Sequence, residues 1–228
     1  MKAEYFDSDK DKAQCVNNYR VVMVSNCMLH SIFARMPKSK LYILGLVTLL
    51  IFPLVGITIV GVFEEDPWAF SWSMHMAWWK QLAIGSAFGL LSGWFAWSLI
   101  SMEFMKPVVL KYQPLIQSLR LNNVDLVFMS LCAGIGEEVL FRGVLQSYWG
   151  IWITAVVFVA IHGYLDPRDK KMSIYGASLT LVIAGMGYLT DYVGLVAAMS
   201  AHAVLDIILF YKLTRYKNHE VNSLDQHL

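Results

Sequence analysis

Charged residues are scarce in this sequence. Only 15% of its 228 residues are charged, whereas 57% are hydrophobic and the mean hydropathy is +0.51. A water-soluble surface carries more charge than this, so the composition excludes an ordinary soluble domain and predicts a single-domain membrane protein. The net charge is only +1, and the basic residues are scattered, so we expect no nucleic-acid partner.

Three other features are missing. Cys15, Cys27 and Cys132 are an odd number of cysteines without CxxC spacing, so neither a disulfide framework nor a thiolate zinc site is supported. The zinc-protease pattern HExxH does not occur. The first 20 residues contain no apolar core, so we expect no cleaved secretory signal and predict insertion through internal segments.

Long apolar runs are what the sequence does contain. A helix needs about 20 apolar residues to cross a bilayer. The pattern therefore predicts an all-α transmembrane bundle with about six spans, at 41–63, 81–102, 124–147, 151–165, 174–190 and 194–213. The segment 151–165 is too short to cross alone and is expected to be tilted, broken or sunk behind its neighbours. Apolar spacing over 21–36 predicts an interfacial helix before the first span.

The loops predict the orientation, because positively charged flanks stay in the cytoplasm. The loop at 63–80 is acidic and rich in tryptophan, so we place it outside. The connectors near 106–120 and 166–172 and the tail after 212 carry lysine and arginine, so we place them inside. This arrangement predicts an integral membrane protein with both termini in the cytoplasm, and we expect the membrane to be the bacterial inner (cytoplasmic) membrane.

Six polar groups fall in the last four segments: Glu137, Glu138, Arg142, His162, His202 and Asp206. Four of them are formally charged, and each charge at mid-membrane costs about 3 kcal/mol. They must therefore be paired, neutralised or hydrated. A structural clamp would explain one pair, but six such groups in one bundle favour a functional site.

Helical geometry separates the two glutamates. Glu138 and Arg142 are four residues apart and lie within ion-pair reach, whereas Glu137 points about 100° away from Glu138. Glu137 is therefore left free, and near an imidazole it is a candidate general base for water. His202 and Asp206 share one helix face in the same way, and His162 shares a face with Phe158.

These residues carry a resemblance. GEEVLFRG (136–143) is similar to the EExxxR motif of the CPBP family of intramembrane proteases, the CAAX protease and bacteriocin-processing or Abi family. The other two family motifs, FxxxH and HxxxN/D, are matched by FVAIH (158–162) and HAVLD (202–206). The resemblance covers about 124–213. It does not identify the N-terminal spans. Together with the predicted spans it divides the chain into four parts: a cytoplasmic or interfacial segment (1–40), two spans with a connector (41–123), a catalytic helical core (124–213) and a cytoplasmic tail (214–228).

The resemblance also implies a mechanism. Glu137 would act as the base, and His162 would orient the attacking water or share its proton. Glu138 with Arg142 would hold the helix, and His202 would face the scissile carbonyl oxygen. Asp206 stands where asparagine is commoner, and an ionised aspartate cannot donate to an oxyanion. We therefore expect Asp206 to be protonated or to fix the His202 tautomer.

Several alternatives stay open. The family has been described as metalloproteases, and two glutamates with two histidines could bind zinc. We favour catalysis without a cofactor, because the glutamates are adjacent instead of one helical turn apart. A proton-coupled transporter and a non-enzymatic binding protein that confers bacteriocin immunity are the other functional classes. As a peptidase, the protein would act on a membrane-associated peptide or protein. The sequence does not choose among CAAX processing, sorting-signal removal, peptide maturation and immunity.

Overall fold

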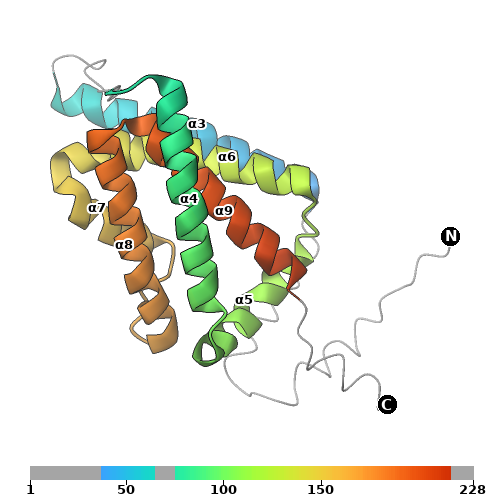
Figure 1. Cartoon of the computed structure of the whole chain (residues 1–228). Coiled ribbons are helices and arrows are strands. Elements are labelled where there is room, and N and C mark those ends of the chain that lie inside the picture. Colours follow the sequence, from blue (N-terminus) through green and yellow to red (C-terminus); the bar gives the residue numbers. More distant parts are fainter. Residues whose placement is uncertain (1–36, 65–74, 217–228) are drawn as a thin grey trace, which may run out of the picture.

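The computed structural model describes residues 37–64 and 75–216, and every regular element in these ranges is helical (Figure 1). The all-α fold class is therefore confirmed. The elements are α3 (Lys38–Phe63), α4 (Trp78–Ile100), η1 (Glu103–Met105), α5 (Lys106–Ser118), α6 (Asn123–Leu140), η2 (Phe141–Leu145), α7 (Gln146–Ile161), α8 (Lys170–Tyr192) and α9 (Leu195–Arg215). The interfacial helix expected over 21–36 lies outside the described residues.

Five helical stretches in the described ranges are long and apolar enough to cross a membrane: 38–63, 78–100, 123–161, 170–192 and 195–215. By length and composition they make the chain an integral membrane protein. The expectation of six differs because the segments 124–147 and 151–165 join into one helical stretch. That stretch is bent rather than straight.

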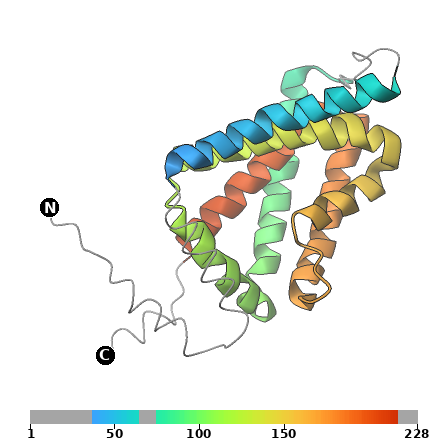
Figure 2. The ribbon, with the colours of Figure 1, turned by 180° about the vertical axis from the view of Figure 1, so that it is seen from behind.

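The bend lies at Gly150, inside α7. Its backbone is non-helical, with φ 73° and ψ 169°, a conformation that glycine adopts at little cost. Figure 2 shows α7 turning away from the end of α6 and running back toward α8. After the bend, residues 151–161 form a helix about 16 Å long, less than the hydrocarbon thickness of about 30 Å. The segment 151–165 is therefore too short to cross alone, as expected, but the break lies just before it at Gly150 and not within it.

The connector after α4 contains a helix, α5, that the sequence did not predict. Both views place α5 at the same end of the bundle as the start of α8 (Figures 1 and 2).

The last turn of α9 carries Lys212 and Arg215, and the Lys212 ammonium lies 4.8 Å from the ring centroid of Trp94. Cations beside aromatic rings are typical of a membrane interface.

α3 runs along α6, side by side with it in Figure 2. Asn122 and Asp125 form a capping box at the start of α6, each side chain accepting from the other residue's backbone N–H. The buried Asp125 carboxylate also accepts from the Tyr42 hydroxyl and, at 2.5 Å, from the Lys38 ammonium of α3. One carboxylate therefore caps α6 and ties α3 to it.

α9 lies at the centre of the bundle and contacts α4, α5, α6 and α8. α4 meets it through glycines at every fourth position, Gly85, Gly89 and Gly93. A Cβ at Gly85 or Gly89 would collide with the backbone carbonyl of Ala197 or Ala201. Small residues let the two helix backbones approach closely, as membrane helix packing requires.

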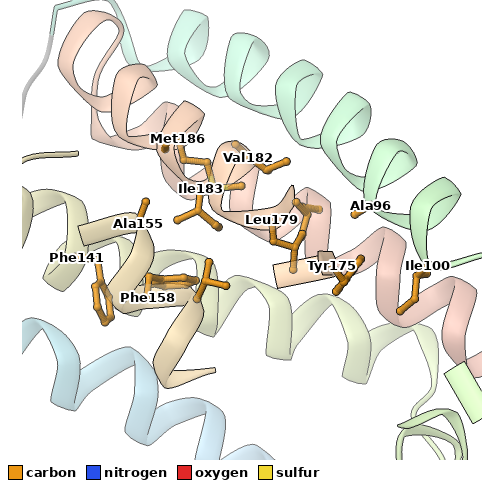
Figure 3. Close-up of a cluster of buried hydrophobic side chains, with 14 of the residues drawn as sticks. Ala96, Ile100, Phe141, Ala155, Phe158, Tyr175, Leu179, Val182, Ile183 and Met186 are labelled. Carbon is orange, nitrogen blue, oxygen red and sulfur yellow. The ribbon is translucent and has the colours of Figure 1, made fainter. Parts of the chain in front are cut away.

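The apolar core lies among η2, α7, α8 and α9. Phe141, Phe158, Tyr175, Leu179 and Ile183 are all buried in it, and Figure 3 shows them converging from neighbouring helices. Phe141 and Phe158 meet edge to face with ring centroids 4.9 Å apart. This core supports the polar groups described next, because Phe158 belongs to both.

Candidate active site

Glu138 is the most enclosed of the polar groups, with none of its surface exposed. Its Oε1 atom accepts from Arg142 Nη1 at 2.8 Å, so the expected pair within the helix is present. The same atom lies 2.8 Å from His202 Nδ1 of α9, a contact across 64 residues of sequence that the helix geometry did not predict. Glu138 therefore links α6, η2 and α9.

Glu137 faces a different set of partners. Its Oε2 atom is buried and has no hydrogen bond within the described part of the chain. This oxygen lies 3.5 Å from His162 Nε2 and 4.0 Å from His202 Nε2. Three residues from α6, the end of α7 and the middle of α9 thus meet at one point, with Glu137 free of the arginine.

The contacts of Nδ1 orient both imidazole rings. His162 Nδ1 lies 2.7 Å from the backbone carbonyl of Phe158, which can only accept, so Nδ1 carries the proton. His202 Nδ1 likewise faces the Glu138 carboxylate. In their neutral forms both histidines therefore present an unprotonated Nε2 toward Glu137.

Asp206 lies at the edge of this cluster, with 22% of its side chain exposed. Its Oδ2 atom is 3.5 Å from His202 Nε2. One of the two roles expected for Asp206 was to fix the His202 tautomer, and the structure assigns that contact to Glu138 instead. Glu138 makes this contact because α6 packs on α9, which brings Glu138 Oε1 next to His202 Nδ1.

Phe158 contacts more of the site than its four-residue spacing from His162 indicated. Its ring stacks on His162 at a centroid distance of 4.3 Å and meets His202 edge to face at 5.7 Å. The Arg142 guanidinium lies 4.6 Å from the same ring centroid, within cation–π range. One aromatic ring thus contacts all three of these groups. The available signal was the i, i+4 spacing to His162.

The helix widens into a π-helical turn, η2, which begins three residues after Glu138. Such turns often occur at functional sites. Arg142 lies in this turn, and the next residue on its face, Gln146, donates to the Gly187 carbonyl at 3.1 Å and to Asp191 Oδ1 at 2.7 Å. A cavity of about 200 Å³ is lined in part by Arg142, Gln146 and Asp191. Sequence reasoning missed Gln146, although 138, 142 and 146 follow each other at helical spacing.

A zinc ion would need ligands about 3.3 Å apart, as tetrahedral bonds of about 2.0 Å require. The separations from Glu137 Oε2 to the two Nε2 atoms, 3.5 and 4.0 Å, are wider. Glu138 Oε1 is already occupied by Arg142 and His202. Among the described residues, no group of three or more His, Cys, Asp or Glu side chains has the spacing to hold a metal ion. The arrangement fits zinc poorly, and catalysis without metal stays a prediction.

Fold and site together define a class: a helical membrane protein with a buried carboxylate–imidazole centre. Residues 120–208 match the family model described as type II CAAX prenyl endopeptidase Rce1-like, so this segment of the chain is similar to the CPBP family. All three motifs, 137–142, 158–162 and 202–206, fall inside the match. The family's description points to a CAAX-protease type of peptidase.

One curated relative is similar over part of its length. It is the uncharacterized protein YpbD of Bacillus subtilis (strain 168), 29% identical over 105 residues. The match covers 45% of this chain and 52% of YpbD, so the chain spans about half the length of that relative. No solved structure matches.

Proposed function

We propose that the protein is an intramembrane endopeptidase that hydrolyses a peptide bond with water activated by Glu137 and His162. The observation that carries this proposal is the environment of Glu137 Oε2. That atom is buried and without a hydrogen bond in the described residues, and it lies 3.5 Å from an imidazole nitrogen. Two acceptors so close together suit a shared water molecule, which can donate to both.

The reaction then follows from these positions. Glu137 takes a proton from the water as the water oxygen bonds to the carbonyl carbon of the substrate, and the carbonyl oxygen becomes an oxyanion. The carbon–nitrogen bond then breaks, and the proton held by Glu137 passes to the leaving nitrogen. His162 is held by the Phe158 carbonyl and ring, which keeps its Nε2 directed at the water.

The other residues stabilise this arrangement. Glu138 and Arg142 neutralise each other and keep α6 against α9, so that the free carboxylate stays next to the histidines. In its doubly protonated form His202 has an N–H at Nε2 to donate to the oxyanion. Asp206 lies beside the same nitrogen and balances that positive charge.

We infer that the site serves a membrane-associated peptide or protein from the cytoplasmic side of a bacterial inner membrane. The support is the position of the basic connectors. α5 and the start of α8 lie at one end of the bundle, which follows if α7 returns across part of the bilayer after the Gly150 bend (Figure 2). Lysine and arginine favour the cytoplasmic side.

The clustering of polar groups supports a peptidase over a transporter. A proton path would spread ionisable side chains across the bilayer, whereas Glu137, Glu138, His162 and His202 gather at one point. A binding protein without activity would need no buried carboxylate free of hydrogen bonds, a group that costs folding free energy.

The test needs no known substrate. Membrane vesicles from cells that produce the wild type or Glu137→Gln are incubated, and new protein termini are mapped by mass spectrometry. We expect termini that appear with the wild type and are absent with Glu137→Gln. Glu103→Gln, an exposed glutamate at the connector, is the matched control and should behave as the wild type. Identical termini with the wild type and Glu137→Gln would refute the proposal.

A further inference from the structure

The chain reverses sharply after His162. Gly163 has φ 77°, its N–H donates to the Ala160 carbonyl at 2.9 Å, and the Tyr164 N–H donates to the Val159 carbonyl at 3.2 Å. This pair of bonds is the Schellman motif, in which a glycine ends a helix in the left-handed conformation. The turn sends the next residue, Tyr164, back toward the site.

Tyr164 is held there from three sides. Its ring lies parallel to that of His162, with an interplanar angle of 2° and centroids 6.4 Å apart. It meets the ring of Tyr175 edge to face at 5.9 Å. The Tyr164 carbonyl occupies the space where a Cβ would stand at Gly176 of α8, so only glycine allows this approach. The position of Tyr164 is therefore fixed by its contacts with His162 at the end of α7 and with Tyr175 and Gly176 of α8.

Within the described part of the chain, the Tyr164 hydroxyl makes no hydrogen bond. Tyr164 lies in the loop that follows the third apolar stretch. Burial, together with the nearby charges of Asp206 and Glu137, raises the pKa of Tyr164 to about 12. The hydroxyl therefore keeps its proton at neutral pH and can donate a hydrogen bond.

The proposed hydrolysis needs a hydrogen-bond donor in the active site. The oxyanion formed during hydrolysis is stabilised by hydrogen-bond donors aimed at it. Asp206 can supply none when ionised, because a carboxylate only accepts. His202 supplies one at most, since its Nδ1 is engaged with Glu138.

We propose that Tyr164 is a further catalytic residue, whose hydroxyl donates a hydrogen bond to the scissile carbonyl oxygen as negative charge develops there. The proposal rests on the peptidase function proposed above. Tyr164 keeps its proton throughout, so no bond forms or breaks at this residue and the proton balance of the hydrolysis is unchanged.

The experiment compares single oxygen deletions in the purified full chain. The probe is a fluorogenic peptide that carries a cleavage site mapped in the vesicle experiment. Tyr164→Phe keeps the ring and its stacking and should lower kcat by about 10²–10³-fold with KM within about twofold. Tyr175→Phe is the matched control on the neighbouring ring and should keep kcat within about twofold. Asp206→Asn added to Tyr164→Phe should restore part of the rate, because an amide can donate.

The outcomes separate the two proposals. A wild-type kcat in Tyr164→Phe, or an equal loss in Tyr175→Phe, overturns the role of the hydroxyl. So does a fall in the melting temperature of Tyr164→Phe that accounts for the lost activity. An inactive Glu137→Gln beside a fully active Tyr164→Phe contradicts this inference alone. Full activity in Glu137→Gln, or no cleavage by the wild type, removes the peptidase proposal and this inference with it.

Discussion

Removing Arg142 should destabilise the protein, whereas neutralising Glu137 should not. The Arg142 side chain is 1% exposed and pairs with Glu138, which is fully enclosed. Breaking a buried ion pair by deleting one partner costs about 3–5 kcal/mol. Arg142→Ala also removes the contact with the Phe158 ring, while the His202 contact keeps Glu138 partly satisfied. We therefore expect a loss of about 3 kcal/mol.

At about 2–4 °C per kcal/mol for a chain of this size, this loss lowers the melting temperature by about 6–12 °C. Glu137 has no such partner, so Glu137→Gln should abolish turnover without lowering the stability of the protein. The measurement is thermal unfolding of the detergent-purified variants, followed by tryptophan fluorescence.

A double-mutant cycle supplies the control. Glu138→Gln combined with Arg142→Gln leaves no unpaired charge and should be more stable than either single variant. The reasoning is refuted by a wild-type melting temperature in Arg142→Ala, or by equal losses in Arg142→Ala and Glu137→Gln with activity kept in the latter.

Three further changes test the site and its support. Asp206→Asn should retain substantial peptidase activity in the presence of chelator. A chelator-sensitive wild type restored by zinc, with an inactive Asn variant, would contradict catalysis without metal. Gly89→Leu should disrupt the packing of α4 on α9 and lower the yield of folded protein, whereas the exposed Ala87→Leu should not, as size-exclusion chromatography can compare. Phe158→Leu should lower kcat at least tenfold by freeing the His162 ring, and unchanged kcat would exclude that role.

The parts of this protein that follow from local geometry could be predicted. Apolar length located the spans, because a helix satisfies its own backbone within one segment. The Glu138–Arg142 pair followed from i, i+4 spacing in the same way. The separation of Glu137 from Glu138 followed from the 100° turn between adjacent residues. The three motifs also indicated the resemblance to the CPBP family before any packing was known.

The bend at Gly150 shows where prediction from local patterns ends. Composition marked 151–165 as too short to cross, but it could not say that the segment turns back toward α8. The direction of the chain after the bend depends on the backbone conformation of Gly150 and on the packing of α7 against α8. α5 was also missed, because it is a short helix of 13 residues that packs against α9.

The site itself depends on contacts between distant segments. Glu138 and His202 are 64 residues apart, and their bond exists because α6 packs on α9. The hydrogen bond that fixes the His202 tautomer could therefore be assigned to Asp206 from spacing, but to Glu138 from the packed bundle. Tyr164 reaches His162 only after a turn at Gly163 and a close approach to Gly176. Helical periodicity sets which residues share a face, whereas the packing of one helix on another sets which faces meet.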